Sequence, residues 1–211
     1  MKSTEETIAI IDYQMGNIGS IRKMLSKLGY DSVVSNSVNE LEKYSKFILP
    51  GVGNFQNGAK KLHDLNIYNF LKNLKDEDNK YLLGICLGMQ LLFEGSEEGN
   101  DSMKGLGLIK GRVNKFIDLQ DGSKIPHMGW NFVEIISNEN ILKHLEEESR
   151  FYFVHSFFGE PANPNNTLTT TVYGGKVFCS SVFDKNIFGT QFHPEKSHKF
   201  GFSFLKGFCE L

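Results

Sequence analysis

The run YLLGICLGMQLLF at residues 81–93 constrains the fold of this chain more than any other feature. An apolar segment leads into GICLG at residues 84–88, and a second apolar segment follows. We expect a strand, a sharp turn that carries Cys86, and a helix over residues 89–93. Glycines on both sides of the cysteine allow a strained backbone that side chains would block. The helix would direct its free N–H groups and its positive dipole end toward the sulfur, which favours the nucleophilic thiolate.

Packing is a second interpretation of Cys86, because free cysteines are among the most buried side chains. The flanking glycines and the switch from strand to helix favour catalysis. Cys179 and Cys209 lack such a frame, and we expect them to be packing or idle thiols. Three widely spaced cysteines without a CxxC pair fit neither a disulfide framework nor a zinc site. We therefore expect free thiols in a reducing compartment. We expect neither a metal nor a cofactor.

Bulk properties limit the class of protein. The chain has 211 residues, which is long enough for one domain with a hydrophobic core. Its net charge is −2, so the charge shows no basic surface of the kind that binds nucleic acid. No apolar run approaches the roughly 20 residues that cross a bilayer. The first residues, MKSTEETIAIID, lack the features of a secretory signal. We expect a cytoplasmic single-domain protein over residues 1–211 that binds neither nucleic acid nor membrane.

Short apolar strands alternate with helices in the first ninety residues. Strands are expected at 7–11, 32–34 and 47–49 and from residue 81, and helices at 18–28 and from 59 toward 74. This order is typical of a parallel sheet covered by helices. A charged, glycine-containing surface loop is expected at 94–104.

The second half is rich in β-branched and aromatic residues. Strands are expected at 106–116, 125–136, 151–158, 167–173 and 176–183, separated by turns such as those at 120–122 and 173–175. A loop is expected at 161–166. A buried strand at 187–192 and a helix at 200–211 complete the chain. Together the pattern predicts an α/β fold: an open, mostly parallel sheet flanked by helices, with appended antiparallel strands.

The hexapeptide TQFHPE at 190–195 supplies a candidate base. If the backbone stays extended, His193 and Glu195 lie on the same side, and Pro194 favours an extended residue before it. A carboxylate can hold the imidazole in one tautomer, and the imidazole can move a proton between Cys86 and a leaving amine. A His-x-Glu pair is also common on solvated surfaces, so its weight comes from its combination with the Cys86 turn.

A third signal is PGVG at residues 50–53, directly after a predicted strand. In open α/β sheets, sites form beyond the carboxyl ends of the strands. Backbone N–H groups in this turn and that of Leu87 could bind an oxyanion. An ordinary tight turn is the alternative.

These motifs together resemble the class I, triad-type glutamine amidotransferases. The motifs that carry this resemblance are PGVG at 50–53, GICLGMQ at 84–90 and QFHPEKS at 191–197. More narrowly, DYQMGN at 12–17, PHMGWN at 126–131 and YFVHS at 152–156 resemble the glutaminase subunit of imidazole glycerol phosphate synthase. The resemblance covers nearly the whole chain and implies a flavodoxin-like fold.

The resemblance implies a role for each matching position. Cys86 would attack the side-chain amide carbon of L-glutamine, His193 would shuttle the proton, and Glu195 would orient the imidazole. The oxyanion would be met by the N–H of Leu87 and a backbone N–H from Gly51, Val52 or Gly53.

The same resemblance places the substrate. Gln90 and Glu98 would hold the amino-acid end of glutamine, and backbone near His155 and Ser156 would close the pocket. For Glu98 a solvated loop charge is the alternative, because Glu97 adjoins it.

The product implies a partner. Ammonia is mostly protonated in neutral water, and ammonium is a poor nucleophile, so ammonia must reach its acceptor through a sheltered passage. One glutaminase domain leaves no room for a synthase, and the resemblance names a separate (β/α)8-barrel cyclase that makes imidazole glycerol phosphate and an aminoimidazole ribotide. The positions expected at the interface of this heterodimer are Asn17, His127, Trp130 and Lys196. A core position is the alternative for Trp130, the only tryptophan.

Departures from the family pattern keep other functions open. Gln14 stands where the family usually has glycine, Gly19 where a larger residue is common, and Phe follows His155-Ser156 where Tyr is frequent. They leave room for a paralogous glutaminase that feeds another acceptor, such as an enzyme that amidinates a bacterial surface sugar. A cysteine hydrolase with its own substrate and a regulatory member of the fold are further alternatives. The remaining histidines, His63, His144 and His198, are expected at the surface.

Overall fold

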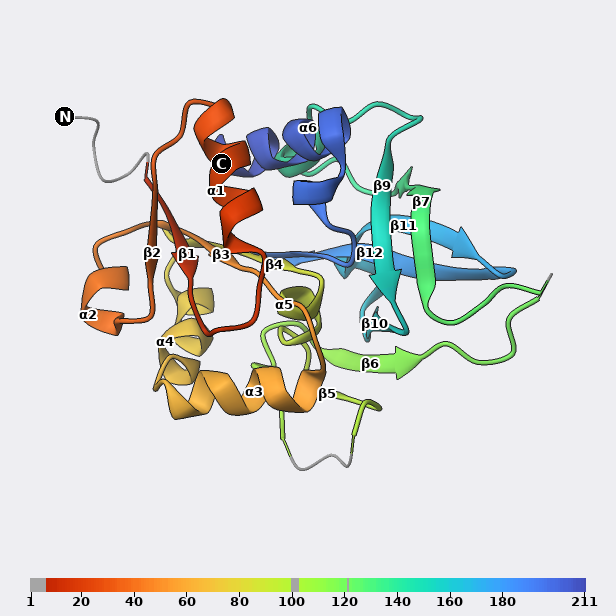
Figure 1. Cartoon of the computed structure of the whole chain (residues 1–211), viewed down its shortest axis with the longest axis horizontal. Coiled ribbons are helices and arrows are strands. Elements are labelled where there is room, and N and C mark those ends of the chain that lie inside the picture. The colour runs from red at the N-terminus through yellow and green to blue at the C-terminus, as the bar shows by residue number, and fades with distance from the viewer. Residues whose placement is uncertain (1–6, 100–102, 121) are drawn as a thin grey trace.

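A computed structural model describes residues 7–99, 103–120 and 122–211, and an eight-stranded sheet forms its centre (Figure 1). The strand order is β2-β1-β3-β4-β13-β12-β11-β8. Five neighbouring strands are parallel: β2 (Ser32–Ser35), β1 (Ile8–Ile11), β3 (Lys46–Leu49), β4 (Tyr81–Ile85) and β13 (Ile187–Thr190). The other three are antiparallel: β12 (Lys176–Asp184), β11 (Thr167–Tyr173) and β8 (Glu134–Ile135). The predicted α/β class is confirmed.

Helices cover both faces of the sheet, as the apolar strands require. In β1, Ile8 and Ile10 belong to one core cluster and Ala9 and Ile11 to the other. The first cluster packs under α1 (Ile18–Lys27) and α6 (His198–Cys209), and the second packs under α3 (Phe55–Asp64) and α4 (Tyr68–Asn73). Figure 1 shows α1 and α6 above the sheet and α3 and α4 below it. A strand buried on both faces reads as a continuous apolar run, as observed.

The register of the central strands brings three loops together. Leu49 of β3 pairs with Gly84 of β4, and Ile85 of β4 pairs with Thr190 of β13. The segments after Leu49, Ile85 and Thr190 therefore leave the sheet at the same edge. These segments carry the glycine-rich turn, Cys86 and His193.

Two small sheets lie beside the main one, whereas we expected their strands to extend it. One has the order β10-β6-β5, from Phe157–Pro161, Gly111–Lys115 and Gly95–Ser96, and the other pairs β7 (His127–Phe132) with β9 (Arg150–His155). The predicted strand at 151–158 breaks at Ser156, so β9 and β10 join different sheets. A break of this kind depends on tertiary pairing, which residue propensity does not encode.

The predicted helix at 89–93 is wrong in extent, because α5 spans only Leu87–Gln90. The carbonyl groups of residues 91–93 accept hydrogen bonds from the 106–109 segment instead of continuing the helix, with Leu106 N to Leu91 O at 2.8 Å and Ile109 N to Leu92 O at 3.0 Å. A four-residue helix has little dipole, so the dipole argument for Cys86 loses weight.

Other boundaries also differ from expectation. The helix predicted from 59 toward 74 is divided into α3 and α4 by Asn66, whose φ of 57° is left-handed. The helix α2 (Val38–Leu41) was missed, and the expected loop at 94–104 contains β5, whose two residues are buried. Residues 100–102 of that loop and Asp121 of the turn at 120–122 lie outside the described residues. Within the described ranges, the longest apolar helices are too short for a bilayer.

Candidate active site

Cys86 occupies a strained turn between β4 and α5. Its φ of 53° and ψ of −108° are unusual for a residue with a side chain. The turn is held because Cys86 N donates to Thr190 O at 2.7 Å and Gln90 N donates to Cys86 O at 3.1 Å. Strain of this kind, held by the surrounding structure, is typical of functional sites.

The glycines beside Cys86 are required by close backbone approach. A Cβ on Gly88 would lie 1.9 Å from the carbonyl oxygen of Leu49, and one on Gly84 would lie 2.6 Å from the carbonyl oxygen of Gly88. Any side chain at either position would push α5 away from β3 and β4. The expectation that glycines make this turn possible therefore has a direct structural cause.

His193 and Glu195 form a buried pair beside Cys86. The side chains are 1% and 2% exposed, and His193 Nδ1 lies 2.8 Å from Glu195 Oε1. A carboxylate only accepts, so Nδ1–H donates and Nε2 is left for proton exchange. Within the described chain, Nε2 has no partner that meets standard hydrogen-bond geometry.

The charge state of His193 follows from its neighbours. Burial lowers the pKa of His193, but its interactions with Cys86 and Glu195 outweigh burial and raise this pKa to about 10. Negative charge on either neighbour favours the imidazolium form. The surroundings of His193 therefore favour its imidazolium form.

The His193–Glu195 contact forms by a different route from the one we expected. His193 itself is extended, but Glu195 lies in the 3-10 turn η5 (Pro194–Lys196). Ser197 fixes this turn, because its hydroxyl donates to His193 O at 2.6 Å and accepts from Tyr152 N at 3.0 Å. The extended-backbone argument reached the right contact through the wrong geometry.

A cavity of about 330 Å³ brings most of the predicted site residues together. Its lining contains nine of the positions expected to bind or react with substrate: Val52, Gly53, Cys86, Leu87, Gln90, Glu98, His155, Ser156 and His193. Gly51 and Glu195 are not part of this lining. Gly51 packs so tightly that a Cβ there would lie 2.5 Å from Gly88 N and 2.6 Å from the hydroxyl oxygen of Tyr13.

Two residues near this cavity were missed by sequence reasoning. Tyr13 is fully buried with no partner for its hydroxyl among the described residues, and its pKa is raised by burial and by Cys86. Gln191 Nε2 lies 3.7 Å from Cys86 Sγ. Both stand inside the quoted motifs DYQMGN and QFHPEKS, so motif membership was the available signal.

Gln90 and Glu98 are both held in place by the protein. Gln90 is buried, and its Nε2 donates to Phe157 O and to Gln191 Oε1, each at 3.1 Å. Glu98 Oε2 accepts from Phe55 N at the start of α3 at 2.7 Å. Glu98 is half-buried and lines the cavity, whereas Glu97 is exposed, lies outside that lining and accepts from Lys115 N at 2.7 Å.

The expected interface residues differ in exposure. Trp130 is 44% exposed and stacks on His198 with a centroid distance of 5.5 Å, so the core alternative is wrong. Lys196 is exposed, and Asn17 is half-buried. The interface prediction for His127 does not agree with its burial, because the residue is 2% exposed and its ring lies against His155.

The remaining histidines and cysteines take structural positions. His63 and His198 are exposed, and His144 is half-buried against Glu210 at 2.7 Å. Cys179 and Cys209 are buried, and burial raises the pKa of each to about 12. These raised pKa values disfavour the thiolate, which is the reactive form of cysteine.

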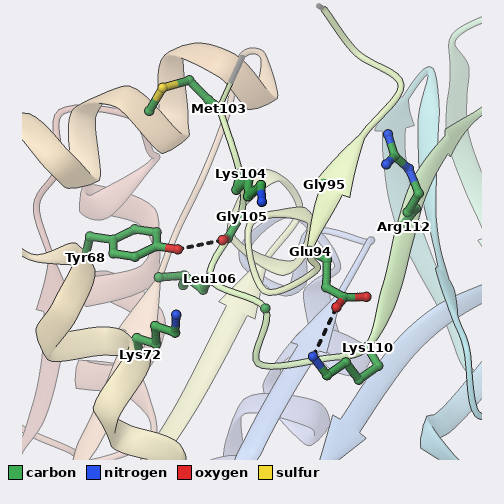
Figure 2. A pocket seen from close by; sticks show the side chains of 11 residues that line it. Tyr68, Lys72, Glu94, Gly95, Met103, Lys104, Gly105, Leu106, Lys110 and Arg112 are labelled. Carbon is green, nitrogen blue, oxygen red and sulfur yellow. Dashed lines mark hydrogen bonds and ion pairs between the residues drawn. The ribbon is translucent and has the colours of Figure 1, made fainter. Parts of the chain in front are cut away.

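A larger hollow of about 610 Å³ lies elsewhere (Figure 2). Tyr68 Oη donates to Gly105 O at 2.9 Å on one side, and Lys110 pairs with Glu94 at 3.0 Å on the other. Its other charged side chains are exposed, and its lining contains no cysteine or histidine. Cys86 and His193 line the smaller cavity instead. Across 7–99, 103–120 and 122–211, no three His, Cys, Asp or Glu side chains form a metal-binding group.

Comparison with known proteins agrees with the site geometry. The family model described as glutamine amidotransferase class-I matches residues 9–208. The chain is 47% identical to the imidazole glycerol phosphate synthase subunit HisH 2 of Methanococcus maripaludis, covering 96% of this chain and 98% of that one. It is 43% identical to the subunit HisH 2 of Pseudomonas aeruginosa, covering 97% and 99%.

The fold matches solved structures as well. A chain in the structure of PurLQS from Thermotoga maritima superposes with a TM-score of 0.73 at 20% identity, covering 98% of both chains. At that identity the likeness shows the fold alone. The chain belongs to the class-I glutamine amidotransferase family, and within it to the HisH subunits of imidazole glycerol phosphate synthase.

Proposed function

We propose that this chain is the glutaminase subunit that hydrolyses L-glutamine at Cys86 and passes the ammonia to a separate cyclase in histidine biosynthesis. The observation that carries the proposal is the strained Cys86 turn, which shares one cavity with His193, itself bonded to Glu195. A nucleophile, a base and an orienting carboxylate are the parts that acyl transfer requires.

The reaction starts from the Cys86 thiolate and the His193 imidazolium. The sulfur attacks the amide carbon, His193 protonates the nitrogen, and the C–N bond breaks to release ammonia and leave a thioester. His193 then takes a proton from water, and the hydroxide attacks the thioester carbon. The C–S bond breaks, which yields glutamate and restores the thiolate.

The oxyanion formed in both steps needs backbone donors. The N–H of Leu87, at the start of α5, and one N–H from residues 51–53 fill this role. The tight packing of Gly51 against Gly88 holds the two segments side by side. Gly53 has a φ of 108°, which a residue with a side chain rarely adopts.

The substrate's amino-acid end lies between Gln90 and Glu98. The carboxylate of Glu98 attracts the α-ammonium, and Gln90 contacts the same end of glutamine. The backbone at His155 and Ser156 closes the cavity opposite Cys86. The lining of one 330 Å³ cavity by all of these residues supports this arrangement.

The partner is a (β/α)8-barrel cyclase that uses the ammonia to make imidazole glycerol phosphate. The interface includes Asn17, Trp130 and Lys196, which are exposed or half-buried around η5 and β7. We place the heterodimer in the cytoplasm, in keeping with three free cysteines. The glutaminase is one domain over residues 1–211, in keeping with a family match from 9 to 208.

A direct assay tests this function. Glutamate formation is measured with the chain alone and with a barrel cyclase from the histidine pathway. We expect the cyclase to stimulate the rate and Cys86→Ala to abolish it in both conditions. Wild-type activity that the cyclase leaves unchanged would remove the cyclase from the proposal.

A second candidate is a paralogous glutaminase that serves another acceptor. The relatives from Methanococcus maripaludis and Pseudomonas aeruginosa are each named subunit HisH 2. Gln14 also adopts a φ of 66° at a position where the family usually has glycine, and its side chain accepts from Lys61 Nζ at 2.5 Å. This candidate predicts glutaminase activity that a different ammonia-consuming enzyme stimulates.

A further inference from the structure

We propose that His127 is a positioning residue for the glutamine cavity, acting through a directional hydrogen-bond chain that runs from Asn131 through His127 and His155 to the carbonyl of Phe157. This inference rests on the proposed function, because it concerns the same cavity. It gives His127 a role inside the chain in place of a contact with the partner.

The direction of the chain follows from its fixed end. His155 Nδ1 lies 2.7 Å from Phe157 O, which only accepts, so Nδ1 bears the hydrogen. In a neutral imidazole, Nε2 is then an acceptor. His127 Nδ1 lies 2.9 Å from that Nε2 and must donate to it.

The same argument extends to Asn131 of β7. A neutral His127 that donates from Nδ1 has an accepting Nε2, and Asn131 Nδ2 lies 3.3 Å from it. Asn131 Nδ2 also donates to Val172 O at 2.9 Å, and its Oδ1 accepts from Phe132 N at 2.8 Å. Both amide atoms of Asn131 are thus assigned, and the chain has one allowed direction.

The environment keeps both histidines neutral. His127 stacks between the rings of Phe153 and Tyr173, with centroid distances of 4.7 and 4.0 Å. Burial lowers the pKa of His127 to about 4 and that of His155 to about 3. A second cation beside His193 is thereby excluded, since His193 also disfavours charge on His155.

The chain ends at groups that contact the nucleophile. Phe157 O accepts from His155 and also from Gln90 Nε2 at 3.1 Å. Gln90 Nε2 also donates to Gln191 Oε1 at 3.1 Å, and Gln191 Nε2 lies 3.7 Å from Cys86 Sγ. A shift of the Phe157 carbonyl would therefore move Gln90, the residue placed at the substrate.

The consequence for His155 is specific. Its one N–H is used by Phe157 O and its one acceptor by His127, so no ring nitrogen remains for glutamine. His155 lines the cavity but binds substrate through no side-chain hydrogen bond. It transmits the position of His127 to the Phe157 carbonyl.

A pair of substitutions separates positioning from bulk. His127→Leu removes the donor and leaves His155 Nε2 buried without a partner, whereas His127→Asn keeps an amide donor near the Nδ1 position. With the cyclase complex, we expect His127→Leu to raise the KM for L-glutamine at least tenfold with a smaller change in kcat. We expect His127→Asn to keep KM within about threefold of wild type. Equal KM values for wild type and His127→Leu, or equal losses in both variants, would overturn the inference.

A spectroscopic measurement on the unmodified chain does not depend on either variant folding. Long-range ¹⁵N–¹H NMR identifies the tautomer of each histidine. We expect His127 and His155 both to carry the hydrogen on Nδ1 near neutral pH. An Nε2–H tautomer at either residue would break the chain and refute the proposal. Absence of glutaminase activity from the wild-type complex would instead refute the proposed function, and the tautomer result would be unaffected.

Discussion

His193 Nδ1 lies 2.8 Å from Glu195 Oε1, although Pro194 between them begins a 3-10 turn. The turn brings the carboxylate back to Nδ1 of the imidazole. The other carboxylate oxygen, Oε2, is buried without a partner in the described chain. Glu195 is thus used almost entirely by His193, which is the arrangement expected of an orienting acid.

Glu195→Gln tests this relationship. A glutamine can accept from His193 Nδ1–H but has no negative charge to stabilise the imidazolium. We expect kcat for glutamine hydrolysis to fall by about 10²-fold or more, the range in which positioned acid–base groups contribute. The measurement is steady-state glutamate formation with the cyclase present.

A matched control uses Glu97, an acid outside the lining of the Cys86 cavity. Glu97 is exposed, and the one hydrogen bond of its carboxylate within the described residues comes from the backbone N–H of Lys115, so Glu97→Gln should keep kcat within about twofold. Comparable losses in Glu195→Gln and Glu97→Gln would assign the effect to net charge and contradict an orienting role.

The pKa of His193 predicts how stability depends on alkaline pH. Its folded pKa of about 10 lies above the unfolded value of about 6.5, so its contribution is complete below about pH 6.5 and is lost as pH rises through 10. Relative to His193→Asn, the wild-type free energy of unfolding should fall by up to about 1.4 kcal/mol per pH unit in that window. Urea unfolding of both proteins between pH 6 and 10 measures it. A wild-type advantage that grows with pH would have the wrong sign.

His127 and His155 predict the opposite dependence in acid. Their folded pKa values of about 4 and 3 lie below the unfolded value of about 6.5, so the unfolded chain binds more protons as pH falls. Stability should decrease from pH 6.5 toward 4, by up to about 1.4 kcal/mol per pH unit for each histidine. Chemical unfolding of wild type and His127→Asn should show a shallower slope in the variant. Parallel slopes would exclude a neutral, buried His127.

Gly88 predicts a large loss of stability from a single methyl group. A Cβ at Gly88 would lie 1.9 Å from Leu49 O, and backbone cannot move aside as a flexible side chain can. Gly88→Ala should lower the free energy of unfolding by about 3 kcal/mol or more. Gly19→Ala is the control, because no atom lies within 4 Å of its Cβ and it sits in α1, so it should stabilise by roughly 0.5 kcal/mol. Similar thermal unfolding of the two variants would contradict the close approach of α5 to β3.

Local patterns were sufficient for the parallel half of the fold. The four-residue strands β1 and β3 and the turn at Cys86 follow from apolar runs that end in glycine, proline or a polar residue. Because parallel strands end at one edge of a sheet, the same patterns also placed Cys86 near His193. The substrate-side positions followed from motifs.

The features that were missed depend on contacts between distant segments. The shortness of α5 comes from hydrogen bonds to the 106–109 segment, and the turn at Glu195 is held by Ser197 and Tyr152. The burial of His127 comes from the rings of Phe153 and Tyr173 and from His155. No local periodicity carries this information, so a motif histidine was assigned to the surface.

The central claim is that Cys86 is the nucleophile for glutamine. The most direct measurement is mass-spectrometric mapping of the cysteines after treatment of the native chain with a glutamine-analogue electrophile. The account predicts modification of Cys86 alone, protection by L-glutamine, and no modification of the buried Cys179 and Cys209. Label on Cys179 or Cys209, or label on Cys86 that L-glutamine fails to block, would contradict it.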